Sequence, residues 1–514
     1  MKSTGKAACI LPHGVLFRGN AEAVIRKQLI KSGFLKAVIG LPANLFYGTP
    51  IPACILVLDK KNASTDKGIF MIDARNGFTK DGPKNRLREQ DLHKIVDAYT
   101  KLTDIPRYSR IVPFTEITDT KNDFNLNLSR YIDSSEHEDI QNIDGHLRGG
   151  IPALDVDDLV EYWKVIPKVR NLLFESISRP GFVKLKLPIT EVKTSILKHP
   201  QFILFNQTAT KVFVDWKKVS TLQLKTFGKK SRPKQLIELL SEDLLDRFKS
   251  TPLVNAYDLY QHLMDYWKET MQDDCYLIAD VGWQDAIQPR EVFKSKDANG
   301  KLMWPKEPFD YLKGKRRFKS DLVPATILIN RYFNLERDTI KLLQAKLSDV
   351  EQKLHDMLEE NSGEEGLLFD LIEGEGDKQK ITAKSVKARL KEINKDPNYV
   401  DEHKALQDYT MLLEKQTNVK NELKAAQDEL DVKLDNKYPK IKENEIKTLV
   451  VDDKWLATLS NAVQIELDRV SQTLTGRIRQ LAERYDVPLP TLIKKLSKLS
   501  VLVDKHLKKM ESEN

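Results

Sequence analysis

Cysteine is scarce in this sequence, with three residues among 514: Cys9, Cys54 and Cys275. Their number is odd and their spacing pairs none of them, which argues against a disulfide framework and against a cysteine-ligated metal site. The nine histidines form no HExxH motif and no pair with metal-ligand spacing, so no metal site is predicted. We therefore expect the reducing environment of the cytoplasm.

Long hydrophobic runs are also missing. Runs such as AACIL (residues 7–11) and ACILVL (residues 53–58) fall far below the roughly 18 residues that a membrane-spanning helix needs. The N-terminus lacks the charged, apolar and cleavage regions of a signal peptide. Glycine and proline number only 22 each while 40% of the residues are apolar, which excludes fibrous and disordered chains. We expect neither secretion nor membrane insertion.

What the sequence does contain is enough apolar material for several cores. At roughly 150 residues per domain, 514 residues predict about three folding units. The net charge of +8 is compatible with a polyanionic partner, but many proteins without such a partner share it.

Residues 1–133 alternate short apolar strands with one helix-like segment, as an α/β unit does. The run KAACIL (residues 6–11) is apolar on both faces and predicts an interior strand of a parallel sheet. A helix is predicted from Asn20, as its cap, to Ser32, with Val24, Ile25, Leu29 and Ile30 on its apolar face and Gly33 closing it. Two further strands, residues 35–41 and 53–60, are joined by a long proline-bearing loop.

Residues 150–331 mix short strands, helices and aromatic residues, and predict an inserted or appended middle domain. Two stretches are strongly basic: residues 211–234 carry eight Lys and Arg against one acid, and residues 290–320 carry ten against four. Basic residues interleaved with aromatics can follow a phosphate backbone and stack on bases. The candidate DNA-backbone residues are Lys229, Lys230, Arg232, Lys315, Arg316 and Arg317. The alternative is a solvated face over a packed aromatic core.

Residues 332–514 are predicted to be all-α and coiled-coil-like. Three apolar seams repeat at helical spacing, at residues 340–357, 406–434 and 459–481, and helical hairpins packing on one another would bury all of them. The final segment, residues 492–510, keeps Leu496, Leu499, Val503 and Leu507 on one face among lysines. It predicts a packing helix or, less commonly, a helix lying on a membrane.

The first sixty residues carry the most specific signal. A strand ends in LPHGVLF, an IRKQL helix follows, the next strand ends in GLP, then come NLFYGT and a strand ending in LVLDK; IDARNGFTKDG (residues 72–82) and DFNLNLSRYID (residues 123–133) continue the pattern. This order resembles the second half of the catalytic domain of adenine-specific DNA methyltransferases, most closely the modification subunit of type I restriction-modification systems. The helical end, with LAERYDVPLPTL (residues 481–492), is also similar to that family.

The resemblance implies a partial doubly wound methyltransferase sheet whose ligand pocket lies outside the carboxyl ends of its strands. The residues expected around that pocket are Pro12, His13, Gly14, Asn44 and Thr49. An adenine inside a duplex must be rotated out of the stack before its amine is methylated, and an aromatic face must then hold it. Phe46 is the candidate for that face, with Tyr47 as the fallback; the alternative is that Phe46 plugs the core beneath its loop.

Members of the family place a glycine-rich S-adenosylmethionine loop, an acidic ribose contact and an Asn-Pro-Pro-Phe tetrapeptide upstream of the strand that opens this chain, and those motifs are missing here. The resemblance therefore implies a truncated, split or internally started subunit, with no catalytic residues of its own and no S-adenosylmethionine binding by this chain alone. The complete subunit would use S-adenosylmethionine and would work with DNA, a specificity subunit, a restriction subunit and the missing N-terminal half. The alternative function is a noncatalytic helical scaffold derived from such a subunit.

Overall fold

The computed structural model describes residues 2–63, 68–134, 140–296, 300, 302–306, 308–361, 363, 366–372, 381–393 and 396–512. The chain divides into two compact units, one of residues 1–220, 234–269 and 459–514 and the other of residues 221–233 and 270–458. These bounds differ from the three predicted domains, because the helical segment predicted over residues 332–514 is divided between the two units.

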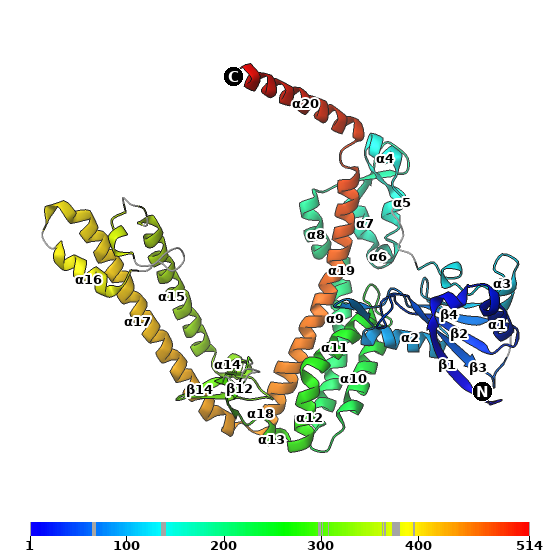
Figure 1. The fold of residues 1–514 in the computed structure, drawn as a ribbon, viewed down its shortest axis with the longest axis horizontal. Coiled ribbons are helices and arrows are strands. Elements are labelled where there is room, and N and C mark those ends of the chain that lie inside the picture. The colour runs from blue at the N-terminus through cyan, green and yellow to red at the C-terminus, as the bar shows by residue number, and fades with distance from the viewer. Residues whose placement is uncertain are drawn as a thin grey trace. The chain divides into compact units, whose positions relative to one another are not determined.

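A five-stranded sheet forms the centre of residues 1–133 (Figure 1). In the order in which they lie side by side, its strands are β1 (Lys6–Pro12), β3 (Ala53–Asp59), β2 (Leu35–Gly40), β4 (Ile69–Asp73) and β7 (Ser109–Val112). Strands β2 and β4 pair in parallel, whereas β1–β3, β3–β2 and β4–β7 are antiparallel pairs. The sheet is therefore mixed.

Strand β1 corrects a prediction. An interior parallel strand was expected there, but β1 is an edge strand, its neighbour β3 is antiparallel, and most of its residues are exposed. The prediction rested on apolar side chains on both faces, which are typical of a strand with a neighbour on each side. Among the described residues no strand pairs with the outer edge of β1.

Helices cover both faces of this sheet. Alternate side chains of a strand point to opposite faces, and here Val38 and Met71 join the core on the side of α1 (Asn20–Lys31), while Ile39 and Ile72 join the core on the side of α2 (Glu89–Lys101). The predicted α/β layering is confirmed. This part also contains η1 (His13–Leu16), β5 (Thr79–Asp81), β6 (Lys84–Arg86), α3 (Phe114–Thr118) and η2 (Leu128–Arg130).

Helix α1 follows its prediction only in part. It ends before Gly33, whose φ of 63° is left-handed, as predicted. Asn20, however, does not cap the helix with its side chain; Gly19 precedes the first turn. Ile30 is buried, but Val24 and Ile25 are 68% and 61% exposed. Half of the predicted apolar face is thus uncovered within this chain.

The rest of the first unit is mostly helical. Its elements are α4 (Ile143–Arg148), β8 (Ile151–Pro152), α5 (Ala153–Asp157), α6 (Val160–Val165), α7 (Pro167–Leu173), β9 (Phe174–Ser176), β10 (Phe182–Leu185), α8 (Ile189–Lys198), most of α9 (Pro200–Thr226), α10 (Pro233–Phe248), α11 (Ala256–Tyr266), most of α19 (Leu456–Tyr485) and α20 (Leu489–Ser512). Strands β8, β10 and β9 form a small antiparallel sheet.

The seam of α19 is buried, but not where it was expected. Leu474 and Ile478 of α19 share a core with Val169, Ile196 and Phe202 of the preceding middle region. The prediction that this seam packs on the other two helical seams is therefore wrong. An amphipathic pattern specifies that one face is buried, and it leaves the identity of the covering element open.

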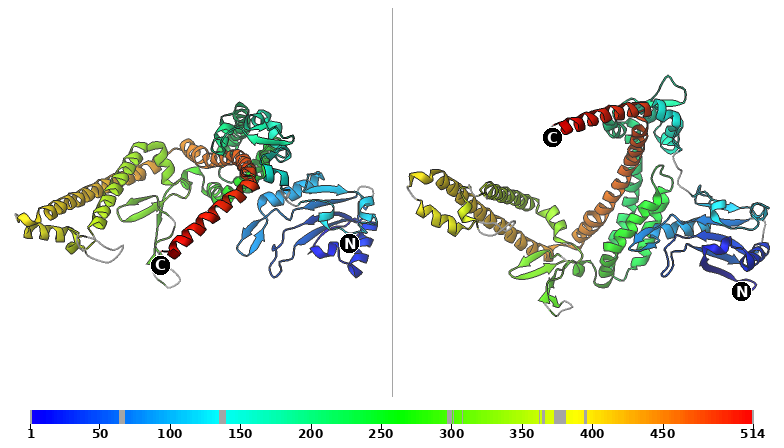
Figure 2. Two further views of the ribbon diagram at one scale, coloured as in Figure 1. Left: turned by 90° about the horizontal axis from the view of Figure 1, so that it is seen from above. Right: turned by 45° about the horizontal axis from the view of Figure 1, so that its top comes forward.

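In the second unit, α15 (Asn334–Glu360) and α17 (Val400–Lys437) lie side by side, as predicted from their seams (Figures 1 and 2). Leu354 and Leu406 share their core with α16 (Ala383–Glu392). Glu336 pairs with Lys433 at 2.7 Å, and Glu351 pairs with Lys420 at 3.1 Å. These pairings make the two helices antiparallel.

The second unit also holds short elements and a buried ion pair. They are η3 (Trp267–Met271, shared with the first unit), α12 (Gln272–Val281), α13 (Trp283–Ala286), β11 (Arg290–Val292), β12 (Ser295–Lys296), β13 (Leu302–Met303), β14 (Tyr311–Lys313), β15 (Arg316–Lys319), α14 (Ala325–Tyr332), η4 (Phe369–Leu371), η6 (Pro397–Tyr399), η7 (Tyr438–Lys440), α18 (Glu443–Lys447) and the π-helix η8 (Thr448–Trp455). The Asp274 carboxylate accepts from Lys454 Nζ (2.6 Å) and Trp455 Nε1 (2.7 Å).

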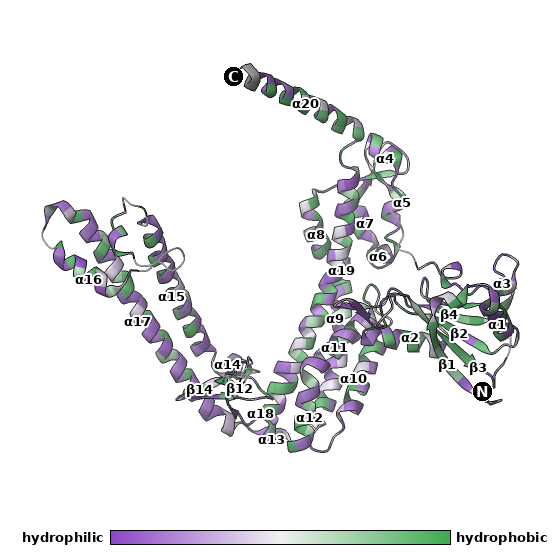
Figure 3. Cartoon of the chain, viewed as in Figure 1, coloured by the Kyte–Doolittle hydropathy of each residue, from purple (hydrophilic) through white to green (hydrophobic). Residues whose placement is uncertain are grey.

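Helix α20 is amphipathic and exposed. Hydrophobic and hydrophilic residues alternate along it in Figure 3, and every residue from 489 to 508 is exposed. In the described part of the chain, no helix has a stretch apolar and long enough to span a bilayer.

Candidate functional site

The two loops predicted to carry the site lie at one edge of the five-stranded sheet. Strands β1 and β2 are both antiparallel to β3 and β4 is parallel to β2, so β1, β2 and β4 end at the same edge. The His13 amide donates to the Pro52 carbonyl (2.9 Å), and the Ala74 amide donates to the Gly40 carbonyl (3.0 Å). The segment Pro12–Gly14, the connection of residues 41–52 and the end of β4 are thereby joined.

The connection between β2 and β3 is shaped by its own hydrogen bonds. Asn44 adopts a left-handed φ of 55°, and its amide donates to the Pro50 carbonyl (3.2 Å); Thr49 Oγ1 accepts from the Ile51 amide (3.1 Å). Gly48, with a φ of 80°, supplies the turn between them. The loop is therefore ordered, although it contains no helix or strand.

Within this loop the two candidate aromatic residues are accessible. Phe46 is 37% exposed and Tyr47 is 93% exposed, whereas the neighbouring Leu45 packs on the core beneath the sheet edge. A ring that plugged the core would be buried. The Tyr47 ring has Lys84 Nζ 5.7 Å from its centroid.

A short hairpin, β5–β6, holds the aromatic loop in place. Lys84 Nζ donates to the Phe46 carbonyl (2.7 Å), the Asn85 amide donates to the Asn44 carbonyl (3.0 Å), and Asn85 Nδ2 donates to the Ala43 carbonyl (2.7 Å). Sequence reasoning did not find Lys84 or Asn85. Their targets are backbone carbonyls, which carry no sequence signal; the one hint was the turn at Gly82, which predicts a hairpin but not what the hairpin contacts.

A charged cluster lies at the end of β4. Arg75 binds the Asp73 carboxylate with two nitrogens (2.7 and 2.6 Å), and Ser134 Oγ donates to the same carboxylate (2.6 Å). Burial by itself would raise the pKa of Asp73, but the hydrogen bonds from Arg75 and Ser134 outweigh burial and lower the pKa. Asp73 is therefore an anion whose negative charge is paired with the positive charge of Arg75.

His13 is the buried titratable group of the Pro12–Gly14 segment. It is 7% exposed, and its Nε2 has no hydrogen-bond partner among the described residues. Burial, with the nearby positive charge of Arg75, lowers the pKa of His13 below its ordinary value. The imidazole is consequently neutral at pH 7. Gly14 is buried beside it, and Pro12 is exposed.

The described residues at this edge do not fit S-adenosylmethionine by themselves. A ribose contact needs a carboxylate with a free oxygen, and both oxygens of Asp73 are engaged by Arg75 and Ser134. The turn that follows β1 has Gly14 beside His13 and Val15, and so lacks the run of small residues that lets backbone amides approach a ligand.

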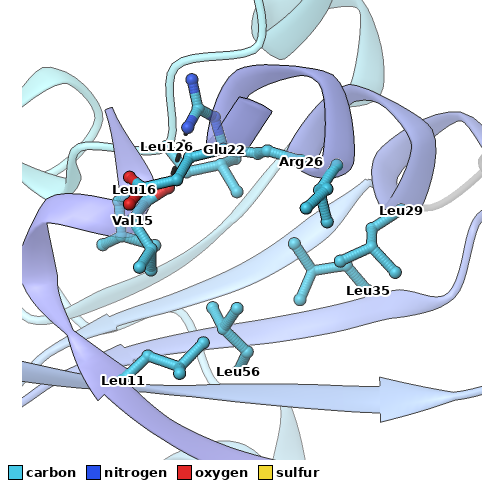
Figure 4. Close-up of a pocket in the computed structure, with 10 residues that line it drawn as sticks. Leu11, Val15, Leu16, Glu22, Arg26, Leu29, Leu35, Leu56 and Leu126 are labelled. Atoms are coloured by element: carbon cyan, nitrogen blue, oxygen red, sulfur yellow. Dashed lines mark hydrogen bonds between the residues drawn. The ribbon is translucent and has the colours of Figure 1, made fainter. Parts of the chain in front are cut away.

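An apolar cavity of about 200 Å³ lies between β1 and α1 (Figure 4). Leu11, Ile25, Leu29 and Leu56 line it, and one wall is closed by Arg26, which donates to the Val15 carbonyl at 2.8 Å. Arg26 also donates to the carbonyls of residues 18 and 124, so this buried cation makes three hydrogen bonds to backbone carbonyls. The cavity therefore suits an apolar side chain, and it lies next to the free edge of β1.

The six basic candidates all lie in the second unit, and their surroundings differ. Lys229, Lys230 and Arg232 are exposed between α9 and α10. Lys315 is exposed in the β14–β15 turn, Arg316 is paired with Glu291 at 3.5 Å, and the guanidinium of Arg317 lies against two aromatic rings. In the portion of the chain that the structure covers, no group of three or more His, Cys, Asp or Glu side chains has an arrangement for a metal ion.

Comparison with known proteins places the N-terminal region. Residues 1–140 match the family model described as N-6 DNA Methylase. Among curated proteins, the type I restriction enzyme MjaVIII methylase subunit of Methanocaldococcus jannaschii is 38% identical over 138 residues, covering 26% of this chain and 24% of that protein. The MpnII methylase subunit of Mycoplasma pneumoniae is 35% identical over 135 residues, again covering 26% and 24%.

Among solved structures, the methyltransferase subunit of a type I restriction-modification system from Streptococcus thermophilus is 44% identical, with a TM-score of 0.24 and coverage of 26% of this chain and 27% of that one. The chain spans about a quarter of the length of the curated relatives it matches. Residues 1–140 are thus similar to N-6 DNA methylases, and the resemblance to modification subunits of type I restriction-modification systems is confirmed over that part of the chain.

Proposed function

We propose that the chain is part of the modification subunit of a type I restriction-modification system, which transfers a methyl group from S-adenosylmethionine to the exocyclic amine of adenine in a specific DNA site. The observation that carries the proposal is the match of residues 1–140 to N-6 DNA methylases. Within that region, the partly exposed Phe46 lies at the carboxyl edge of the sheet, where ligands bind in open α/β folds.

In this proposal Phe46 stacks on the extruded adenine. A flipped base loses its stacking neighbours, and an aromatic ring restores part of that contact. The hydrogen bonds from Lys84 and Asn85 fix the loop backbone on both sides of the ring, so less conformational entropy is lost when the base binds.

The exposed edge of β1 and the neighbouring cavity are the proposed docking place for the other half of the methyltransferase domain. Unpaired amides and carbonyls along an edge strand can pair with a further strand. A helix packed beside that strand would place an apolar side chain in the cavity near Leu11 and Ile25. The glycine loop, the ribose carboxylate and the catalytic tetrapeptide would then come from that half.

The test is reconstitution. Alone, the chain should show no S-adenosylmethionine binding by calorimetry. After coexpression with an N-terminal half that carries the glycine loop and Asn-Pro-Pro-Phe, with the specificity subunit present, we expect cofactor binding and methylation of adenine in duplex DNA. Micromolar cofactor binding by the isolated chain would contradict the assignment of the cofactor site, and a stable complex without methylation would contradict the proposed function.

Assembly with the specificity subunit is proposed to use α20. Its exposed apolar residues Leu492, Leu496, Leu499 and Val503 repeat at alternating spacings of four and three residues, which suits packing against partner helices. A chain ending before Leu489 should fail to copurify with the specificity subunit while its melting temperature stays unchanged. Association with the restriction subunit is proposed on the resemblance alone.

A noncatalytic scaffold is the second candidate function, and the exposed apolar face of α20 is the observation that favours it. A scaffold needs the helical surface but not the Phe46 loop. If Phe46→Ala and Asn85→Ala leave every measurable property of the reconstituted complex unchanged while removal of α20 dissolves it, the scaffold explains the chain better than the methyltransferase.

A further inference from the structure

The small sheet β11–β15–β14 in the second unit has one packed face and one outer face. On the packed face, Phe318 stacks on Tyr311 (ring centroids 5.5 Å apart, 13° between planes), and Tyr311 stacks on Tyr438 (5.8 Å, 22°). Side chains alternate along a strand, so Arg317 points to the other face. A purely structural interpretation of the basic segment requires all of its aromatic residues to lie in the core. Tyr311 and Phe318 lie there, but the face that carries Arg317 is a different one.

Two aromatic rings flank Arg317 on the outer face. Its guanidinium carbon is 4.0 Å from the ring centroid of Trp304 and 4.7 Å from that of Phe309, and Lys294 Nζ lies 5.3 Å from the Trp304 centroid. A guanidinium stacked on rings keeps its N–H groups free at the edge, in the fork that suits phosphate oxygens.

The neighbouring cations differ from Arg317 in having acidic partners. Arg290 pairs with Asp321 at 2.6 Å, Lys313 with Asp435 at 2.9 Å, and Arg316 with Glu291 at 3.5 Å. Among the described residues Arg317 has no such carboxylate. Its charge, together with exposed Lys294, Lys296, Lys306 and Lys315, is left for a ligand.

Exposed apolar side chains lie in the same short stretch as these charges. Phe293 is 69% exposed, Leu302 58%, Met303 51% and Phe309 38%. Aromatic rings alternating with lysines are how sequence-tolerant proteins hold a nucleic-acid strand: the cations contact phosphates and the rings stack on bases. A protein partner with an acidic surface would match the charge but would not require a free ring face.

We infer that this outer face, defined by Lys294, Trp304, Phe309, Lys315 and Arg317, binds an unpaired stretch of DNA strand. We call it the aromatic–basic face. Unpaired rather than duplex DNA is the fitting ligand, because the face of an exposed ring can stack only on a base that is free of its neighbour. The inference goes beyond methyl transfer and does not depend on Phe46, since the two lie in different units of the chain.

The test uses the full chain and a fluorescently labelled DNA strand of about 20 nucleotides, with anisotropy measured at several salt concentrations. We expect binding to the single strand to be tighter than to the matching duplex. Phe309→Ala, at a 38% exposed ring beside Arg317, should weaken single-strand binding roughly 5-fold to 150-fold, the effect of one lost base stack. Lys315→Ala should lower the slope of log affinity against log salt by about 0.7, one phosphate contact.

Matched controls come from α15, where Leu335 is 82% exposed and Lys341 is exposed. Leu335→Ala and Lys341→Ala should leave the affinity and the salt slope unchanged. All four substitutions are at exposed positions, so unchanged melting temperatures will show that folding is intact.

Three results would overturn the inference: no binding at low salt, equal loss for Phe309→Ala and Leu335→Ala, or heparin competing equally well with wild type and Phe309→Ala at unchanged DNA affinity. The last would mark a general polyanion surface, and capture of an acidic protein with DNA binding untouched would mark a protein-docking surface. Phe46→Ala separates this inference from the proposed function. Single-strand binding lost in Phe46→Ala but kept in Phe309→Ala refutes the aromatic–basic face alone. Failed methylation together with single-strand binding that depends on Phe309 refutes methyl transfer alone.

Discussion

Helices α19 and α1 are both amphipathic, yet their apolar faces are covered to different extents. All seven residues of the α19 seam, from Leu459 to Leu481, are no more than 7% exposed. On α1, Ile30 is 2% exposed while Val24 and Ile25 are more than half exposed. The α19 seam is thus covered within this chain, whereas half of the apolar face of α1 is exposed.

A charge placed in the α19 seam should have the largest effect. Leu474 is fully buried among apolar side chains, so Leu474→Asp both opens a cavity and buries a carboxylate without a partner. We expect a loss of more than about 4 kcal/mol in the free energy of unfolding, measured by urea denaturation.

The matched control is Leu496→Asp on α20, where the leucine is 68% exposed. Its effect on unfolding should stay within about 0.5 kcal/mol. Equal effects of the two substitutions would show that α20 is packed against the protein and that the contrast between covered and uncovered faces does not hold.

Helix α2, on the face of the sheet opposite α1, makes ion pairs and hydrogen bonds through Asp97, and lowering the pH should weaken them. Asp97 of α2 accepts from Tyr257 (2.9 Å) and pairs with Lys249 (3.1 Å) and Lys101 (2.7 Å). Burial raises the pKa of Asp97, but these hydrogen bonds outweigh burial and lower the pKa to about 2. A lowered carboxyl pKa stabilises the fold above the unfolded pKa, and the contribution is lost as the pH falls through the folded pKa.

Asp97→Asn should therefore cost about 2 kcal/mol of unfolding free energy at neutral pH, and the gap to wild type should close between about pH 4 and pH 2. Asp349, which faces solvent on α15 beside Lys353, serves as the control, and Asp349→Asn should have almost no effect. A gap for Asp97→Asn that does not change with pH would mean that the lost contacts, rather than the lost charge, are responsible.

A smaller effect is expected from the hairpin that supports the Phe46 loop. Asn85→Ala removes the hydrogen bond to the Ala43 carbonyl and should cost about 1 kcal/mol of stability. In the reconstituted enzyme it should raise the KM for DNA more than it lowers kcat, because it loosens the loop before the base binds. Lys80→Ala, on the same hairpin but exposed, is the control. An unchanged KM would show that the loop holds its shape without β5–β6.

The sequence was informative where function depends on loops that follow strands. LPHG covers the end of β1, and NLFYGT follows the end of β2 by three residues. Strands that run in the same direction end at one edge, so the gathering of Pro12–Gly14 with residues 44–49 was predictable. The position of β1 at the sheet edge was not predictable. Apolar residues on both faces of a strand are typical of an interior strand, but they do not show which strands pair with its two edges.

Contacts to backbone carbonyls and the partners of buried faces were also beyond prediction. Lys84 and Asn85 hold the loop through main-chain oxygens that every residue has. The α19 seam predicted its own burial, but its partners Val169 and Ile196 lie some 300 residues away in sequence. The long-range partner of a face is set by the whole fold and not by the periodicity of the face itself.

The most direct test of the account compares Phe46→Ala with Phe46→Trp in the reconstituted complex, on duplex DNA with the specificity subunit present. If Phe46 stacks on the flipped adenine, Ala should lower methylation roughly 10-fold to 150-fold, Trp should lower it less, and an abasic site in place of the target adenine should erase the binding difference between wild type and Ala. Ala should cost less than about 2 kcal/mol of stability, since the ring is 37% exposed. A binding defect that persists on the abasic duplex, together with a loss of about 3 to 5 kcal/mol of stability, would identify Phe46 as a core residue and contradict the account.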